Sequence, residues 1–140
     1  MYNLRLILVL SYNSIVAWEV EVTDEFKAWW NGLTDAECVS VEAAVLLLEE
    51  RGPHLPYPYC SKVTTSSHSA MRELRVQHKG HPYRVHYIFD PRRVAILLLG
   101  GDKTGDDRWY EKTVPLADRL YEEHLSEIKE EANAKDDQIQ

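Results

Sequence analysis

Apolar and polar residues alternate along two neighbouring segments in the middle of the chain, residues 73–77 and 83–89. Alternation with a period of two is typical of β-strands, because successive side chains point to opposite faces of a sheet. A third run, 94–99, is continuously apolar, which is typical of a strand covered on both faces, and Gly100-Gly101 after it permits a bulge or the close approach of a ligand. The short links between these segments predict an antiparallel meander.

The alternation divides the side chains of this meander between two faces. One face carries apolar side chains that we expect to pack beneath helices, namely Leu74, Val76, Val85 and Tyr87. Arg75, Arg84 and His86 then share the opposite face, which we expect to be open to solvent. Two interpretations of that face stay open: a surface that binds a phosphate-rich ligand, or the ordinary solvated side of a half-covered sheet.

A strand and two helices are predicted upstream of the meander. Residues 16–23 alternate like a strand and precede a short helix that ends at Asn31-Gly32. Thr34 and Glu37 have the spacing of a capping box, so a second helix is predicted from Thr34 to about Arg51. Two helices joined by a tight turn form a hairpin that can cover one face of a sheet.

The end of the chain predicts a third helix followed by a tail. Residues 114–128 have apolar side chains at helical spacing, and Pro115 suits the first turn. Residues 129–140 are charged, so we expect a frayed or disordered tail there. The predicted fold is therefore α+β: a small antiparallel sheet of about four strands with a helical hairpin on one face and a C-terminal helix. The sheet has a mixed edge if the first strand pairs beside the last strand of the meander.

The length of 140 residues fits a single domain, which we place at residues 16–128. Residues 1–15 admit three interpretations: a peripheral or disordered leader, an upstream extension, or an extra edge strand. The apolar run Leu6–Leu10 is too short for a signal peptide. Of the three interpretations we favour the peripheral or disordered leader. No stretch reaches the length of a membrane span, so we expect no contact with membranes. Residues 62–69 are polar and predict a loop that leads into the meander.

Charge is spread unevenly along the chain, whose formal net charge is −7. Residues 71–112 contain nine Lys or Arg and six Asp or Glu, so this stretch is basic. The acidic total argues against a protein that coats nucleic acid generally. An acidic body with one basic face fits either a small RNA-directed site or docking onto a basic partner.

The cysteines and histidines give no sign of a metal centre. Cys38 and Cys60 lie far apart, as expected of reduced thiols in a cytoplasmic protein. The six histidines lack zinc-ligand spacing. We therefore expect neither a metal nor another cofactor.

Four short motifs resemble those of a known superfamily. They are Arg72-Glu73-Leu74-Arg75, Gly80-His81-Pro82-Tyr83-Arg84, Gly100-Gly101-Asp102-Lys103-Thr104, and Tyr110 ahead of Pro115-Leu116-Ala117. With the order of elements, they resemble the RelE/ParE toxin superfamily, in its phage Gp49-like or HigB-like branch, over roughly residues 16–128. The resemblance implies the toxin of a type II toxin–antitoxin pair. It also implies metal-free cleavage of messenger RNA in the ribosomal A site.

The same resemblance implies a partner. In this branch the antitoxin, HigA-like, usually carries a helix-turn-helix domain and represses its own operon. The toxin would then reach operator DNA only indirectly, through the antitoxin.

The resemblance also assigns candidate site residues. Arg75 and Arg84 occupy strand positions like those of the family's basic site residues. Lys103 follows the last strand, at a position where relatives carry a basic residue. Metal-free cleavage needs a group that steadies the extra charge on phosphate, and arginine suits this task. We assign the stabilisation of this charge to Arg84 first and to Arg75 second. His86 is the candidate acid or base, and Lys103 is a candidate source of positive charge or of a proton. The RNA-binding candidates are Tyr110, which can stack on a base, and Lys112, Lys62 and Arg72.

Two other functions stay open at this point. One is a non-enzymatic poison of DNA gyrase, as in the ParE branch of the same fold, which needs only a binding surface. The other is an inactive domain that binds its antitoxin and nothing else. The presence of Arg84, His86 and Lys103 in one region favours the nuclease.

Overall fold

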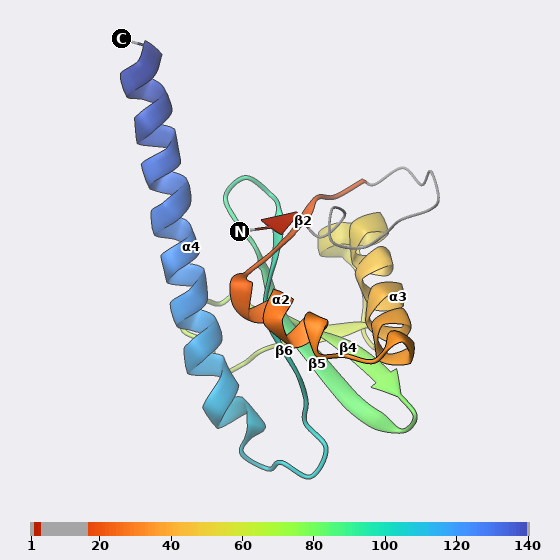
Figure 1. Cartoon of the computed structure of the whole chain (residues 1–140). Helices are drawn as coiled ribbons and strands as arrows, with labels where there is room; N and C mark the ends of the chain where they lie inside the picture. Colours follow the sequence, from red (N-terminus) through yellow and green to blue (C-terminus); the bar gives the residue numbers. More distant parts are fainter. Residues whose placement is uncertain (1, 4–16, 140) are drawn as a thin grey trace.

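The structure is a computed structural model that describes residues 2–3 and 17–139, and it has the predicted α+β fold (Figure 1). The strands are β1 (Tyr2–Asn3), β2 (Val20–Val22), β3 (Cys60–Lys62), β4 (Arg72–His78), β5 (His81–Phe89) and β6 (Ala95–Asp102). The helices are α2 (Asp24–Asn31), α3 (Asp35–Arg51), the short 3-10 helix η1 (Gly52–His54) and α4 (Trp109–Ile139).

All described strands belong to one mixed sheet with the order β1-β2-β6-β5-β4-β3. β4, β5 and β6 form the predicted antiparallel meander. β2 pairs with β6 in parallel, which confirms that the first predicted strand lies beside the last strand of the meander. The short strands β1 and β3 extend the sheet beyond the four predicted strands, and β3 includes Lys62, which we expected in a loop.

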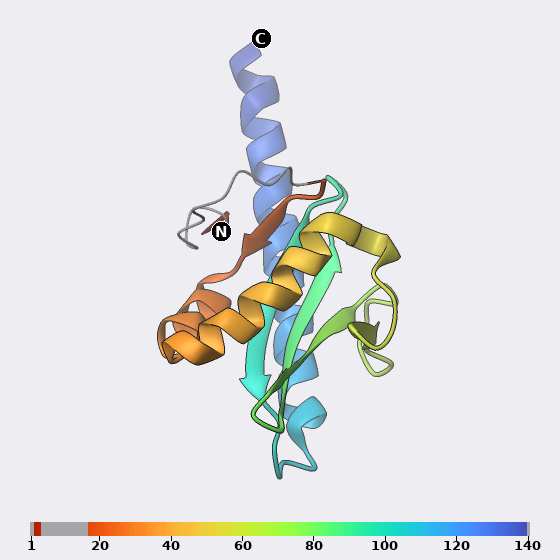
Figure 2. The ribbon, with the colours of Figure 1, turned by 90° about the vertical axis from the view of Figure 1, so that its right-hand side faces the viewer.

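The hairpin of α2 and α3 covers one face of the sheet, as predicted (Figure 2). Thr23 caps α2 by accepting a hydrogen bond from the backbone N–H of Phe26. Thr34 and Glu37 form the predicted capping box of α3. The core on this side consists of Val20, Val22, Phe26, Val41, Val45, Leu48, Leu55, Cys60, Leu74, Val76, Tyr83, Val85, Tyr87, Ala95 and Leu97.

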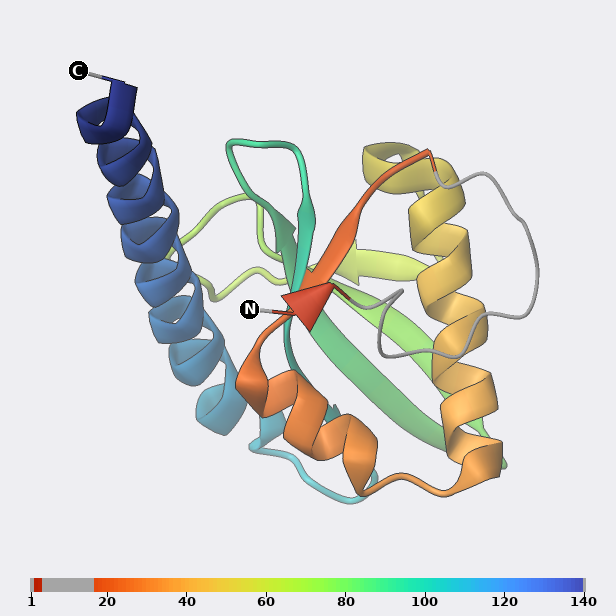
Figure 3. The ribbon, with the colours of Figure 1, turned by 45° about the horizontal axis from the view of Figure 1, so that its top comes forward.

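The opposite face of the sheet is covered by α4, so the sheet lies between two layers of helix (Figure 3). The second core consists of Val63, Met71, Ile88, Val94, Ile96, Leu98, Val114, Ala117, Leu120 and Tyr121. The expectation of an open face is therefore wrong: Arg84 is 4% exposed and His86 is 0% exposed, while Arg75 is partly exposed. Polar residues on a strand do not by themselves show that its face is solvated, because other side chains can satisfy them.

Two glycines of β6 let aromatic rings lie directly against the sheet. A side-chain carbon at Gly100 would come within 2.3 Å of the Trp29 ring, and one at Gly101 within 3.0 Å of the Trp109 ring. Trp29 belongs to α2 and Trp109 to α4, so the two glycines allow one helix to pack closely on each face of the sheet. The groups that approach the backbone closely at these two glycines are therefore indole rings of the protein itself.

α4 is longer than predicted at both ends. It begins at Trp109 rather than near Val114, so Pro115 lies inside the helix. Trp109 is buried, which fixes the first turn against the sheet. The helix continues to Ile139 and extends past the sheet (Figure 1), where we expected a frayed or disordered tail after residue 128. Residues 129–139 are rich in Ala, Glu and Lys, which have high helix propensity.

The predictions for residues 1–15 fall mostly outside the described part of the chain. Tyr2 and Asn3 pair with β2 as an edge strand, and residues 4–16 are not described. Within the described residues, no helix has the length and apolar character needed to span a membrane.

Candidate functional site

Five side chains gather at one end of the sheet, on the face that carries α4: Glu73, Arg75, Arg84, Lys103 and Tyr110. We call them the Glu73 cluster. Arg75 lies directly opposite Arg84 in the β4–β5 ladder, so both project from the same face, and Glu73 shares that face two residues from Arg75. Tyr110 comes from the first turn of α4, and Lys103 from the loop just after β6.

Glu73 is the buried centre of this cluster, with 3% of its surface exposed. Its Oε1 accepts hydrogen bonds from Tyr110 Oη at 2.8 Å and from Ser61 Oγ at 3.0 Å. The same oxygen lies 3.7 Å from Arg84 Nε. Oε2 has no hydrogen-bond partner among the described residues, so this carboxylate retains acceptor capacity.

Arg84 lies beneath the surface rather than on it. Its Nη1 donates a hydrogen bond to the backbone oxygen of Tyr83 at 2.9 Å, and only 5% of its side chain is exposed. A guanidinium held this way contributes positive potential, but a phosphate cannot reach it directly in this conformation. Of the two arginines assigned to phosphate, the partly exposed Arg75 is therefore the accessible one.

Lys103 is the most unusual cation of the cluster. Its Nζ lies 3.5 Å from Tyr110 Oη and 5.2 Å from the centre of the Tyr110 ring. Burial lowers the pKa of Lys103, and the charges of Arg84 and Arg75 lower it further, while Glu73 opposes the shift. A lysine with a lowered pKa gives up its proton more readily than a lysine in water, which suits a general acid.

Tyr110 stays protonated over the physiological range. Burial and its hydrogen bond to Glu73 raise its pKa to about 12. Beside it lies an open hollow lined by Pro82, Lys103, Thr104, Gly105, Asp106, Asp107 and Tyr110. The aromatic ring and Lys103 are thus reachable from solvent at the edge of the cluster.

His86 lies next to the cluster on β5 but beneath the first turn of α4. Its Nε2 is 2.9 Å from Thr113 Oγ1, whose hydroxyl donates to the backbone oxygen of Trp109 at 2.8 Å. Nε2 must then carry the proton, and Nδ1 is left without a partner among the described residues. Burial lowers the pKa of His86 to about 4, so the ring is neutral at pH 7. In this conformation His86 has no route to a substrate.

Arg75 has an aromatic neighbour that the sequence did not suggest. Its guanidinium lies 5.2 Å from the centre of the Tyr57 ring, and Tyr57 is 70% exposed. Tyr57 comes from a loop with two prolines that gives no periodic signal. The other residue missed was Glu73, although its alternation with Arg75 placed it on the same face.

The remaining RNA-binding candidates lie elsewhere. Lys112 is exposed on α4 and pairs with Asp106 at 3.1 Å. Arg72 and Lys62 are register partners on β4 and β3, one residue from Glu73 and Ser61 respectively, so they point to the opposite face of the sheet. Among the described residues, no group of three or more His, Cys, Asp or Glu side chains could hold a metal ion.

Comparison with known proteins shows where the chain belongs. The family described as "Phage derived protein Gp49-like (DUF891)" matches residues 28–122. A Mycobacterium tuberculosis protein (strain ATCC 25618 / H37Rv) described as "Putative toxin HigB3" is 42% identical over 103 residues, covering 73% of this chain and 89% of its own length. A second protein of that strain, "Putative toxin HigB2", is 38% identical over 117 residues.

The second match covers 82% of this chain but only 58% of HigB2, so the chain spans little more than half of that relative. No solved structure matches the chain significantly. The family match includes α3, the whole meander and most of the packed part of α4, and therefore the Glu73 cluster. The chain therefore belongs to the phage-derived Gp49-like family and to the HigB-like toxin family of these relatives.

Proposed function

We propose that this protein is the toxin of a type II toxin–antitoxin system and that it cleaves messenger RNA in the ribosomal A site without a metal ion. The observation that carries the proposal is the Glu73 cluster. It places two accessible cations, Arg75 and Lys103, around a buried Arg84 and a protonated Tyr110. The family supports the toxin assignment, and the geometry supports a site for phosphate.

The reaction would proceed by attack of a ribose 2′-oxygen on the adjacent phosphorus. The bond from phosphorus to the 5′-oxygen breaks, which leaves a 2′,3′-cyclic phosphate and a free 5′-hydroxyl. The 2′-oxygen would lose its proton to water, and the 5′-oxygen would gain one from Lys103, which then recovers a proton from water, so no other reactant is consumed. Arg75 would steady the extra negative charge on the phosphate, and Lys103 would protonate the departing 5′-oxygen.

The remaining residues would support these two. The buried Arg84 would raise the positive potential at the site, and Glu73 would hold Arg84 and Tyr110 in place. Tyr57 and Tyr110 expose aromatic rings on which an unstacked base can lie. We propose a structural role for His86, since its ring is neutral and buried.

The proposal includes a partner and a place of action. A cognate antitoxin, HigA-like and with a helix-turn-helix domain, would neutralise the toxin and carry it to operator DNA. The target, messenger RNA on the ribosome, places the action in the cytoplasm. The ribosome would hold the RNA in position and supply much of the orientation that the reaction needs.

The test is dual pulse labelling after induction of the full chain without an antitoxin. Incorporation of labelled methionine and thymidine is followed in one culture. If methionine incorporation falls first, translation is the target, as proposed. If thymidine incorporation falls first, the protein is a replication poison of the gyrase type and the nuclease proposal is wrong. If neither falls, the domain is inactive.

A further inference from the structure

A second hollow lies on the other face of the sheet, away from the Glu73 cluster. It has a volume of about 420 Å³ and is lined by Pro53, Ser69, Ala70, Arg72, Phe89, Asp90 and Arg93. Phe89 forms an aromatic wall, packed edge-on against Trp18 and Tyr87 at ring distances of 5.7 and 6.3 Å. This wall is therefore apolar and held in place by its neighbours.

Arg72 supplies one fixed guanidinium to this hollow. Its Nη2 donates a hydrogen bond to Cys60 Sγ at 3.3 Å, and its guanidinium also interacts with the Tyr87 hydroxyl, which orients the side chain and leaves some of its five N–H donors for a ligand. Arg72 has no carboxylate within ion-pairing distance among the described residues. In an acidic chain, a partly buried arginine without an acid partner is a candidate binding group.

Arg93 supplies a second guanidinium, and the fold holds it there at some conformational cost. Its φ is 65°, in the left-handed region that non-glycine residues rarely adopt. Its guanidinium lies 5.3 Å from the centre of the Trp18 ring. Among the described residues Arg93, like Arg72, has no ion-pair partner, so both arginines have donors available.

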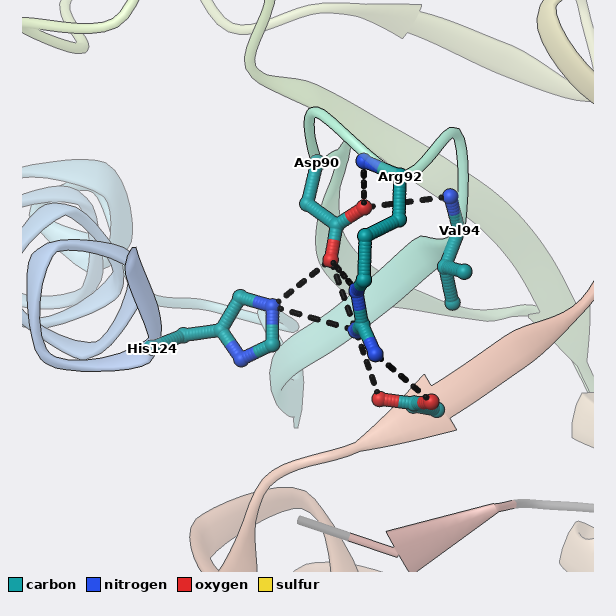
Figure 4. A network of polar contacts seen from close by, with 5 residues as sticks. Asp90, Arg92, Val94 and His124 are labelled. Atoms are coloured by element: carbon teal, nitrogen blue, oxygen red, sulfur yellow. Dashed lines mark hydrogen bonds and ion pairs between the residues drawn. The ribbon is translucent and has the colours of Figure 1, made fainter. Parts of the chain in front are cut away.

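The turn that carries Arg93 is fixed by a network around Asp90 (Figure 4). Asp90 Oδ1 accepts hydrogen bonds from the backbone N–H groups of Arg92 and Val94, at 2.8 and 3.2 Å. Its Oδ2 accepts from Arg92 Nε and from His124 Nε2, both at 2.8 Å. Arg92 Nη2 also donates to Glu21 at 2.9 Å. The Arg92 side chain is therefore paired with Asp90 and Glu21, whereas Arg93 lies on the side of the hollow.

We infer that this hollow binds an acidic peptide segment of a partner protein, with an aliphatic or aromatic side chain of the peptide against Phe89 and carboxylates on Arg72 and Arg93. Charge complementarity supports this occupant, because two pre-positioned guanidiniums flank an apolar wall. The hollow is open to solvent through the exposed residues Pro53, Ser69 and Ala70. An open site suits a peptide side chain better than a small molecule, which needs to be enclosed to bind tightly.

This inference goes beyond the proposed function and does not depend on RNA cleavage. The Glu73 cluster and the hollow use opposite faces of β4, since Glu73 and Arg72 are adjacent in sequence. A bound peptide would therefore leave Lys103 and Arg75 uncovered. Binding here can succeed or fail whatever the outcome of the labelling experiment.

The test is selection of linear peptides from a random phage-displayed library on the purified full chain. Selected peptides are then synthesised, and their affinity is measured by fluorescence anisotropy for four proteins: the wild type, Arg93→Gln, Arg72→Gln/Arg93→Gln and Arg119→Gln. Arg119 is an exposed arginine of α4 outside the hollow and serves as the matched control. Arg93 is exposed, so Arg93→Gln tests the site even if the double variant is poorly folded.

We expect the selected peptides to place an apolar residue beside Asp or Glu. We expect binding about tenfold weaker for Arg93→Gln, weaker still for the double variant and unchanged for Arg119→Gln. Peptides without an acidic bias, or equal affinity of Arg93→Gln and the wild type, would overturn the inference. Displacement of the peptide by inorganic phosphate or uridine monophosphate at equal concentration would show a general anion site instead, and would also overturn it.

Discussion

Two buried carboxylates of this protein, Asp90 and Glu73, each lie beside an arginine but differ in how completely they are hydrogen-bonded. Asp90 accepts hydrogen bonds on both oxygens, from two backbone N–H groups and two side chains. Glu73 accepts from Tyr110 and Ser61 on one oxygen, and its other oxygen has no partner among the described residues.

The difference in hydrogen bonding indicates that Asp90 has a structural role, whereas Glu73 belongs to the candidate functional site. Burial alone would raise the pKa of Asp90, but hydrogen bonds from His124 and Arg92 outweigh it, so the pKa is lowered and the carboxylate stays ionised. A fully satisfied network fixes one geometry, here the turn between β5 and β6. The Glu73 cluster instead keeps partly exposed cations and unused hydrogen-bonding capacity, as a site that must accept a substrate does.

Removing the satisfied carboxylate should have the largest effect on stability. Asp90→Ala leaves His124 without its acceptor, frees the turn and removes one partner of Arg92, so we expect a loss of about 3 kcal/mol in the free energy of unfolding. Urea denaturation followed by circular dichroism measures it. Glu123→Ala removes an exposed partner of Arg119 and should cost less than about 0.5 kcal/mol. Similar losses in the two variants would contradict the structural role assigned to the Asp90 network.

Removing a cation from the unsatisfied cluster should affect activity rather than stability. Lys103→Ala deletes the proposed acid, and we expect about a 100-fold loss of cleavage, which abolishes growth arrest on induction. Its free energy of unfolding should change by less than about 1 kcal/mol, because Lys103 is partly exposed and its pKa is lowered in the fold. Arg119→Ala serves as the control and should still arrest growth.

The neutral His86 predicts a pH dependence of stability. Burial lowers the pKa of folded His86 to about 4, whereas a histidine in the unfolded chain titrates near 6.5. As the pH falls below about 6.5 the unfolded chain binds this proton first, so stability should decline by about 2–3 kcal/mol down to pH 4. His86→Gln should lack this part of the decline. Parallel urea denaturation of both proteins across this range measures the difference, and identical pH profiles would contradict the buried, neutral ring.

The smallest effect is expected for the hydroxyl that joins Tyr110 to Glu73. Tyr110→Phe removes one of the two hydrogen bonds to Glu73 and should cost about 1 kcal/mol of stability. The ring remains, so growth arrest should be slower but not lost. A Tyr110→Phe variant as inactive as Lys103→Ala would mean that the hydroxyl takes part in the reaction, contrary to the supporting role proposed here.

The sequence predicts the elements whose signals are local. The alternation of 83–89, the capping box at Thr34 and the apolar run of 94–99 each depend on neighbouring residues, and the structure confirms them. The start of α4 was misplaced because Pro115 suits a first turn, whereas burial of Trp109 begins the helix earlier. That burial depends on Gly101, which belongs to a separate element.

The candidate site was predicted in part. Arg75, Arg84, Lys103 and Tyr110 come together as the motifs indicated, but the face that carries Arg84 and His86 is covered by α4. Alternation cannot reveal this, because Arg84 and His86 find partners within the protein: Arg84 in Tyr83 and Glu73, and His86 in Thr113. The Asp90–His124 pair joins residues 34 positions apart, and His124 shows in sequence only as part of an apolar stripe.

The most direct test of the central claim is to map cleavage of a defined messenger RNA in a reconstituted translation reaction. Wild-type protein, Lys103→Ala and Arg119→Ala are compared with and without ribosomes stalled on the messenger RNA. We predict cuts within the A-site codon for the wild type and Arg119→Ala, only with ribosomes, and none for Lys103→Ala. Equal cutting by Lys103→Ala, or no cutting by the wild-type protein, would contradict the account.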